Sequence, residues 1–215
     1  MIRDAPSGPE RDSARPVDDA PHEDDAAHAA DAAESIDAAV HVDGGIDGAS
    51  GSCATPNTGI LATWSFAGAT GAQVSTAATA SAPGITAGAV TRSGGVTAVS
   101  GAGSINSSGW PTGAVEAAKY YTFTIAPPPG CRLDLTEMMI DARASASGPA
   151  SSVVATSADA FAHTTVVATS APGPVALIVT DATGTIELRV YGSGATSASG
   201  TLRIQSTLSL RGTLH

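Results

Sequence analysis

Apolar and polar residues alternate along several short stretches of the chain. From 121 to 125, Tyr121, Phe123 and Ile125 alternate with two threonines. From 186 to 190 two charged residues alternate with aliphatic ones, and the same pattern recurs from 202 to 205. A period of two residues indicates β-strands that have one face in a core and the other in water.

Short runs rich in β-branched and aromatic residues are separated by Gly- and Pro-containing breakers from residue 53 onward. They predict about nine strands, at 60–67, 85–92, 120–126, 132–141, 152–157, 161–169, 175–180, 185–191 and 201–210. No segment has a sustained helical period. The predicted fold class is therefore all-β, an antiparallel two-sheet sandwich over 51–215.

The first fifty residues differ sharply in composition from the rest. They hold thirteen of the twenty acidic residues and three of the ten basic ones, so the whole net charge of −10 lies there. Within 19–48 an aspartate opens each block of six residues, from Asp19 to Asp43. Such a segment buries too little apolar surface to offset the entropy of ordering, so residues 1–50 are predicted to be a disordered, low-complexity acidic tail.

Composition also limits the partners of the folded part. Lys119 is the only lysine of the folded part, and the charges of the folded part sum to zero. Both observations argue against nucleic-acid binding. No apolar run approaches the roughly 20 residues of a membrane span. Residues 1–6 lack the apolar core of a signal peptide, so an exported protein is expected to have a leader further upstream, with a lipid anchor on it as one possibility.

Cys53 and Cys131 are the only cysteines. Two cysteines in a chain of exported character predict one disulfide, which joins the N-terminal edge of the domain to the start of an inner strand. The alternative is a pair of buried thiols in a cytosolic protein. The disulfide favours an extracellular or cell-surface location.

A family resemblance rests on several runs, namely 61–66, 120–123, 143–149, 157–161, 187–192 and 200–204. They resemble the jelly-roll-type β-sandwich domains of uncharacterised secreted bacterial proteins, many of them anchored at the surface by PEP-CTERM and similar sorting classes. The Asp/Ala/Pro tail resembles the spacer of bacterial lipoproteins. The resemblance covers 53–212 and implies an exported, jelly-roll-like sandwich without implying an activity.

Catalytic and metal-binding constellations are weak. The domain has seven carboxylates, and no sequence feature marks two of them as a catalytic pair. Glycosidases need two carboxylates ~5 to 9 Å apart. His163 is its only internal histidine, and no nucleophile elbow precedes a helix. The tail histidines His22, His28 and His41 indicate at most loose Zn²⁺ binding. We expect no enzyme activity, no cofactor and no dedicated metal site.

Candidate binding residues are aromatic. Trp110 lies in a polar loop, where together with Tyr120 or Tyr191 it is a candidate platform for stacking on a sugar ring. The loop at 192–200 is a second candidate for contacting a ligand. The alternative for Trp110 is a side chain that closes one end of the core. Arg143 and Asp159 each flank a turn and are predicted to form an ion pair between two loops.

The function expected from the sequence is that of a non-catalytic extracellular or cell-surface module, with a glycan or another envelope component as candidate partner. A structural spacer-and-cap protein without a ligand site is the alternative from another class. A glycoside hydrolase is the third.

Overall fold

The alternating segments become strands whose apolar side chains meet between two sheets. The computed structural model describes Cys53 and residues 56–215. β8 (Tyr120–Ala126) buries its odd-numbered residues and leaves the even-numbered ones half-buried. β13 (Ile186–Ser193) pairs with it so that Leu188 lies opposite Phe123. Because directly opposite residues share a face, this register gathers the apolar side chains of both strands into one core.

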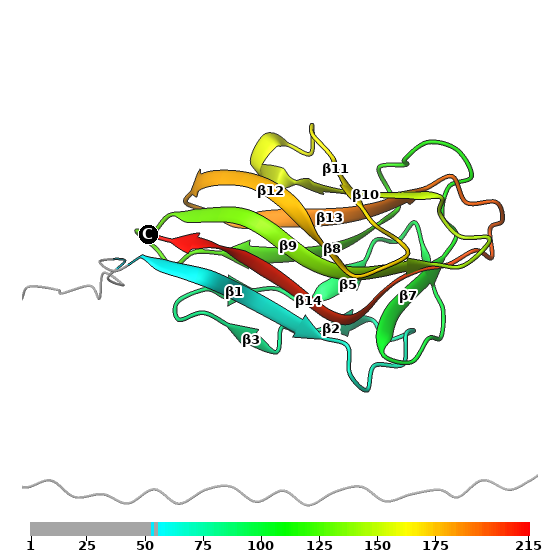
Figure 1. The fold of residues 1–215 in the computed structure, drawn as a ribbon, viewed down its shortest axis with the longest axis horizontal. Coiled ribbons are helices and arrows are strands. Elements are labelled where there is room, and N and C mark those ends of the chain that lie inside the picture. Colours follow the sequence, from blue (N-terminus) through cyan, green and yellow to red (C-terminus); the bar gives the residue numbers. More distant parts are fainter. Residues whose placement is uncertain (1–52, 54–55) are drawn as a thin grey trace, which may run out of the picture. The chain divides into compact units, whose positions relative to one another are not determined.

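Two separate sheets form the sandwich, and every pair of strands in them is antiparallel (Figure 1). The first contains, in order, β12 (Gly173–Ala182), β9 (Leu133–Ala144), β14 (Leu202–Leu214), β1 (Asn57–Ser65) and β3 (Ala80–Ser81), with β7 (Ser104–Ser108) beside β14 and β6 (Thr97–Ala98) beside β7. The second contains β11 (Thr165–Val167), β10 (Ser151–Thr156), β13, β8, β5 (Val90–Arg92) and β2 (Ser75–Thr76), with β4 (Thr86–Ala87) beside β8. The predicted all-β two-sheet sandwich is confirmed.

The connections between eight of these strands are those of a jelly roll. The first strand pairs with the last, β1 with β14, and three more pairs nest inside it: β8 with β13, β9 with β12, and β10 with β11. The order β1-β14-β9-β12 makes the core of one sheet and β8-β13-β10-β11 that of the other. Nested pairs divided between two sheets in this way are the double Greek key of jelly rolls.

The excursion between β1 and β8 holds the strands that the sequence pattern did not reveal. β7 is buried on both faces yet is made mostly of Ser and Asn, so it shows no apolar alternation. Two of its polar side chains bond nearby carbonyls instead: Ser104 Oγ donates to the carbonyl of Gly101 and Asn106 Nδ2 to that of Ser100. Buried polar strands of this kind are invisible to a reading of hydrophobic periodicity.

Two predicted strands are shorter or interrupted in the structure. The 85–92 strand divides into β4 and β5 at Gly88, where a Cβ would lie 2.2 Å from Thr124 Oγ1 and whose carbonyl accepts a hydrogen bond from the Trp64 indole. The 161–169 strand shrinks to Thr165–Val167. The chain before it forms a short 3₁₀ turn, Ser157–Asp159, which the sequence reading did not expect.

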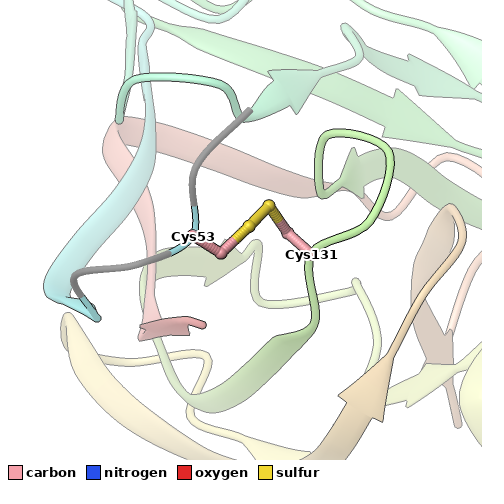
Figure 2. The surroundings of a disulfide bond; sticks show 2 residues. All are labelled: Cys53 and Cys131. Carbon is pink, nitrogen blue, oxygen red and sulfur yellow. A yellow bond between two sulfur atoms is a disulfide. The ribbon is translucent and has the colours of Figure 1, made fainter. Parts of the chain in front are cut away.

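The predicted disulfide joins Cys53 and Cys131, whose Cα atoms are 5.7 Å apart (Figure 2). Cys131 is buried between the Pro-rich turn and the start of β9, and Cys53 precedes β1. The bond therefore ties the first and third strands of the jelly roll together at one end. Closing a loop of 78 residues stabilises the fold by about 4 kcal/mol in the chain-entropy treatment.

The prediction of a disordered tail concerns residues 1–50, which lie outside the residues that the structure describes. Among Cys53 and residues 56–215, no helix is both long and apolar enough to cross a membrane.

Candidate functional site

Trp110 lies in the core, so its proposed role as a stacking platform is wrong. Its side chain is 2% exposed, and its ring packs against Tyr121 with the centroids 5.4 Å apart. The indole nitrogen donates to the carbonyl of Ser107 at 2.8 Å. An indole enclosed in this way presents no face to a sugar. The alternative reading, a tryptophan that closes one end of the core, is the one the structure supports.

The two loops expected to carry binding residues meet over this tryptophan. Backbone N–H groups of Gly194 and Ala195 donate to the carbonyls of Gly113 and Pro111, both at 2.9 Å. The N–H of Gly109 donates to the carbonyl of Ala198, also at 2.9 Å. Mutual backbone hydrogen bonding of this kind closes the end of the sandwich over its core.

Tyr120 and Tyr191 do come together, on the outer face of the second sheet. They occupy opposite positions in β8 and β13, and their ring centroids are 5.5 Å apart. Tyr120 is half-buried, whereas Tyr191 is only 6% exposed. The pair of rings therefore offers one partly accessible aromatic surface.

Arg189 is the centre of this face. Its guanidinium lies 4.5 Å from the centroid of Tyr120 and 4.0 Å from that of Phe161. The same group bonds Glu187 at 2.7 Å and 3.1 Å, and Glu187 also accepts a hydrogen bond from Thr122 at 2.8 Å. Hydrogen bonding from Arg189 holds the pKa of Glu187 below its usual range, and the pKa of Arg189 is raised chiefly by Glu187. The pair is charged at all physiological pH values.

Phe161 reaches Arg189 through a strained turn. Ala160 and Phe161 follow the 3₁₀ turn with φ of 58° and 63°, a region that non-glycine residues rarely adopt. The N–H of Phe161 donates to the carbonyl of Thr156 at 2.9 Å. Strain of this kind persists only where surrounding contacts impose it, and it concentrates at functional segments.

Asp159 braces the same turn from within, so its predicted ion pair with Arg143 is wrong. Its Oδ2 accepts hydrogen bonds from the backbone N–H of His163 at 3.0 Å and lies 2.8 Å from His163 Nδ1. The hydrogen bond with the His163 side chain is the main cause that lowers the pKa of Asp159. Two residues four apart therefore lock the segment 157–163, which we call the edge turn.

Arg143 is held by a residue of its own strand. Asp141 and Arg143 are two positions apart on the same face of β9, and Arg143 Nε bonds Asp141 Oδ1 at 2.6 Å. Arg143 also donates to the carbonyl of Ser170. Arg143 therefore forms its ion pair with Asp141 and not, as the sequence had predicted, with Asp159.

Beside the edge turn the sandwich has a partly enclosed cavity of about 370 Å³, which we call the edge cavity. It lies at the lateral edge between β10 and β12, where β11 pairs with β10 only as far as Val154. Its lining is mainly apolar, and the residues are Val154, Ala155, Thr156, Asp159, His163, Thr165, Leu177 and Ile178. A cavity of this size, apolar with a few converging polar groups, has the general character of a small-molecule site.

The sequence pattern could not predict this cavity. Its aliphatic wall comes from strands that read as ordinary core and edge segments, and the two strands are brought together only by the jelly-roll connection. Asp159 and His163, spaced by four residues, were the one local signal, since an aspartate can accept from a backbone N–H that follows it and so hold a turn.

Comparisons with protein-family models, with curated proteins and with solved structures find no match to this chain.

Proposed function

We propose that this chain is the non-catalytic binding module of an exported or cell-surface protein, and that its ligand occupies the edge cavity. The observation that carries the proposal is the combination, in one cavity, of an aliphatic wall with the Asp159–His163 pair. A sandwich edge that served only to close the core would be filled by side chains, because protein interiors are packed to the density of organic crystals.

The lining indicates the chemistry of the ligand. Leu177, Ile178 and Val154 suit an aliphatic group of a few carbons. Asp159, whose pKa is lowered, supplies a negative charge, and two threonines, Thr156 and Thr165, also line the cavity. We therefore infer an amphipathic ligand, with a short aliphatic part and an ammonium or other hydrogen-bond donor at its polar end.

Export is supported by the disulfide. Structural disulfides form and persist in oxidising compartments and are rare in the cytosol. The Cys53–Cys131 bond, the jelly-roll connections and the resemblance to surface-anchored bacterial domains agree with a module that faces the cell envelope. Amphipathic envelope components have the chemistry that the cavity suits.

A glycan platform is less favoured than the cavity. Of the three aromatic residues first considered, Trp110 and Tyr191 are buried, and the ring of Tyr120 already stacks on Arg189. An Asp–His pair is also a part of many hydrolases. In the described residues, however, the hydrogen bonds of the His163 ring go to Asp159 alone, so no hydroxyl nucleophile is poised against it.

The proposal is tested by uptake of a neutral apolar fluorophore, N-phenyl-1-naphthylamine, and its displacement by hexylamine or hexanoate. The full chain is compared with Ile178→Thr, which removes part of the exposed wall without touching the core, since Ile178 is 91% exposed. Val166→Thr is the matched control, because Val166 is an exposed aliphatic residue on β11 outside the cavity lining.

We expect the fluorophore to be taken up by the wild-type chain and by Val166→Thr, and less by Ile178→Thr. Hexylamine should displace it better than hexanoate, and Asp159→Asn should erase that preference. No uptake, or equal uptake by all three chains, would remove the cavity as a site and favour the structural spacer.

A further inference from the structure

Three side chains of types that can bind metals converge at one end of the first sheet, and none of them lines the edge cavity. Asp134 lies near the start of β9, Asp181 near the end of β12, and His215 directly after β14. The backbones meet there because His215 continues the pairing of β14 with β9 by exchanging hydrogen bonds with Arg132. One ligand atom from each of the three side chains lies within 4.8 Å of the other two.

A backbone hydrogen bond orients one of the two carboxylates toward the imidazole. The backbone N–H of Asp181 donates to Asp134 Oδ1 at 2.7 Å, which orients that carboxylate and directs Oδ2 toward the imidazole. His215 Nε2 lies 3.3 Å from Asp134 Oδ2 and 4.0 Å from Asp181 Oδ1. Asp134 is therefore held in place by a neighbour, as metal-binding carboxylates commonly are.

His215 Nε2 has no hydrogen-bond partner, although two carboxylates flank it. The side chain as a whole is 34% exposed, but the Nε2 atom itself is shielded from solvent and makes no hydrogen bond within the described residues. A shielded nitrogen that lies near two carboxylates and still makes no hydrogen bond is uncommon and calls for an explanation. An ion between this nitrogen and the carboxylate oxygens would satisfy it.

We propose that Asp134, Asp181 and His215 bind a divalent metal ion of the zinc type. One imidazole nitrogen and two carboxylate oxygens are a donor set for zinc and its neighbours, whereas calcium takes six to eight oxygen ligands. Bonds of about 2.0–2.1 Å at tetrahedral angles place ligand atoms about 3.3 Å apart, which is the separation of His215 Nε2 and Asp134 Oδ2.

Asp181 is the ligand that has to move. Its side chain is 63% exposed and its oxygen lies at 4.0 Å from the imidazole, so a small rotation completes the set. Arg132 Nη1 lies 3.8 Å from the same oxygen and is itself exposed, so it competes with the metal and turns into solvent when the metal binds. The fourth position is left for water.

A metal here would reinforce the end of the sandwich that the disulfide already ties. It would link β9, β12 and β14, and Asp134 stands three residues from Cys131. Because the site is formed only when these strands are paired, binding would add to the stability of the folded state.

The test is a titration of the full chain with ZnCl₂ and CoCl₂. His22, His28 and His41 are first replaced by alanine, so that the tail histidines contribute no binding. In that background Asp134→Asn and His215→Ala are compared with two controls, Glu137→Gln for another half-buried carboxylate of β9 and His163→Ala for an exposed histidine. Near-UV circular dichroism of each metal-free variant checks that it is folded.

We expect one Zn²⁺ per chain, visible d–d absorption with Co²⁺, and a rise in Tm of about 4 °C or more at saturating Zn²⁺. Asp134→Asn and His215→Ala should weaken binding at least about tenfold and abolish the rise in Tm, while the controls keep both. Asp134→Asn decides the matter if His215→Ala does not fold. Binding by the parent that is no tighter than by Asp134→Asn, or no binding, would overturn the proposal.

Discussion

The guanidinium of Arg189 lies 4.0 Å from the centroid of the Phe161 ring, and this contact fixes the edge turn to the outer face of the second sheet. Arg189 is itself held by Glu187, so the ring rests on an immobilised cation. The turn carries Asp159 and His163 at the edge cavity. We therefore expect the position of the cavity's polar groups to depend on this cation–π contact with β13.

Phe161→Ala should loosen the edge turn without unfolding the sandwich. Loss of a cation–π contact and of a half-buried ring is expected to cost about 1–2 kcal/mol of unfolding free energy. Amides of residues 157–163 should exchange with deuterium faster than in the wild-type chain, while those of β8 and β13 stay protected. Phe161→Tyr, which keeps the ring, is the control; equal exchange rates in Phe161→Ala and the wild type would show that the ring does not hold the turn.

Trp110→Ala should act on stability and not on ligand binding. Removing a buried tryptophan leaves a cavity and an unpaired Ser107 carbonyl, so urea unfolding should show a loss of about 3–5 kcal/mol. Trp110→Phe should lose less. If Trp110→Ala were as stable as the wild type, the indole would have to be more exposed than its 2% exposed fraction indicates.

Asp141 should make the domain sensitive to acid. Burial raises its pKa, but hydrogen bonds from Gln205, Arg143 and Ser206 outweigh burial and hold the pKa below the ordinary value of 3.8. A carboxyl with a lowered pKa stabilises the fold above its unfolded pKa, and this contribution disappears as the pH falls through the folded pKa.

Unfolding free energy of the wild type should therefore fall as the pH drops below about 4. Asp141→Asn should be less stable at pH 7 by about 1–3 kcal/mol and should fall less steeply in acid. Parallel pH profiles for the two proteins, measured by urea unfolding, would show that Asp141 does not contribute to the acid transition.

The disulfide should carry much of the stability at its end of the sandwich. Cys53→Ser combined with Cys131→Ser is expected to lower the free energy of unfolding by about 2–5 kcal/mol. Mass spectrometry with and without reductant gives the state of the wild-type bond. A chain whose Tm does not change on reduction would mean that the link between β1 and β9 adds nothing to their pairing.

The sequence predicted the strands that alternate and missed those that do not. β8 has the predicted bounds, because its odd positions are all apolar and two threonines stand between them. β7 was missed because its buried side chains are Ser and Asn, which bond nearby carbonyls. The Cys53–Cys131 bond was predicted because only two cysteines were available to pair.

The candidate site was less predictable, since it depends on which residues the fold brings together. Tyr120 and Tyr191 were named and do meet, across β8 and β13. The sequence left Trp110 open between a stacking platform and a core residue because its loop composition is polar, and the structure places the ring in the core. The cavity and the cluster of Asp134, Asp181 and His215 depend on contacts between strands far apart in sequence, which local patterns do not encode.

The most direct test of the edge cavity as a binding site is a ¹H–¹⁵N correlation spectrum of the full chain, titrated with millimolar hexylamine. Binding in this cavity predicts saturable shift changes confined to amides around it, such as those of Ala155, Asp159, Thr165 and Leu177, with smaller changes in Ile178→Thr. Shifts that stay unchanged, or that spread over β1 and β14 instead, would contradict binding in this cavity.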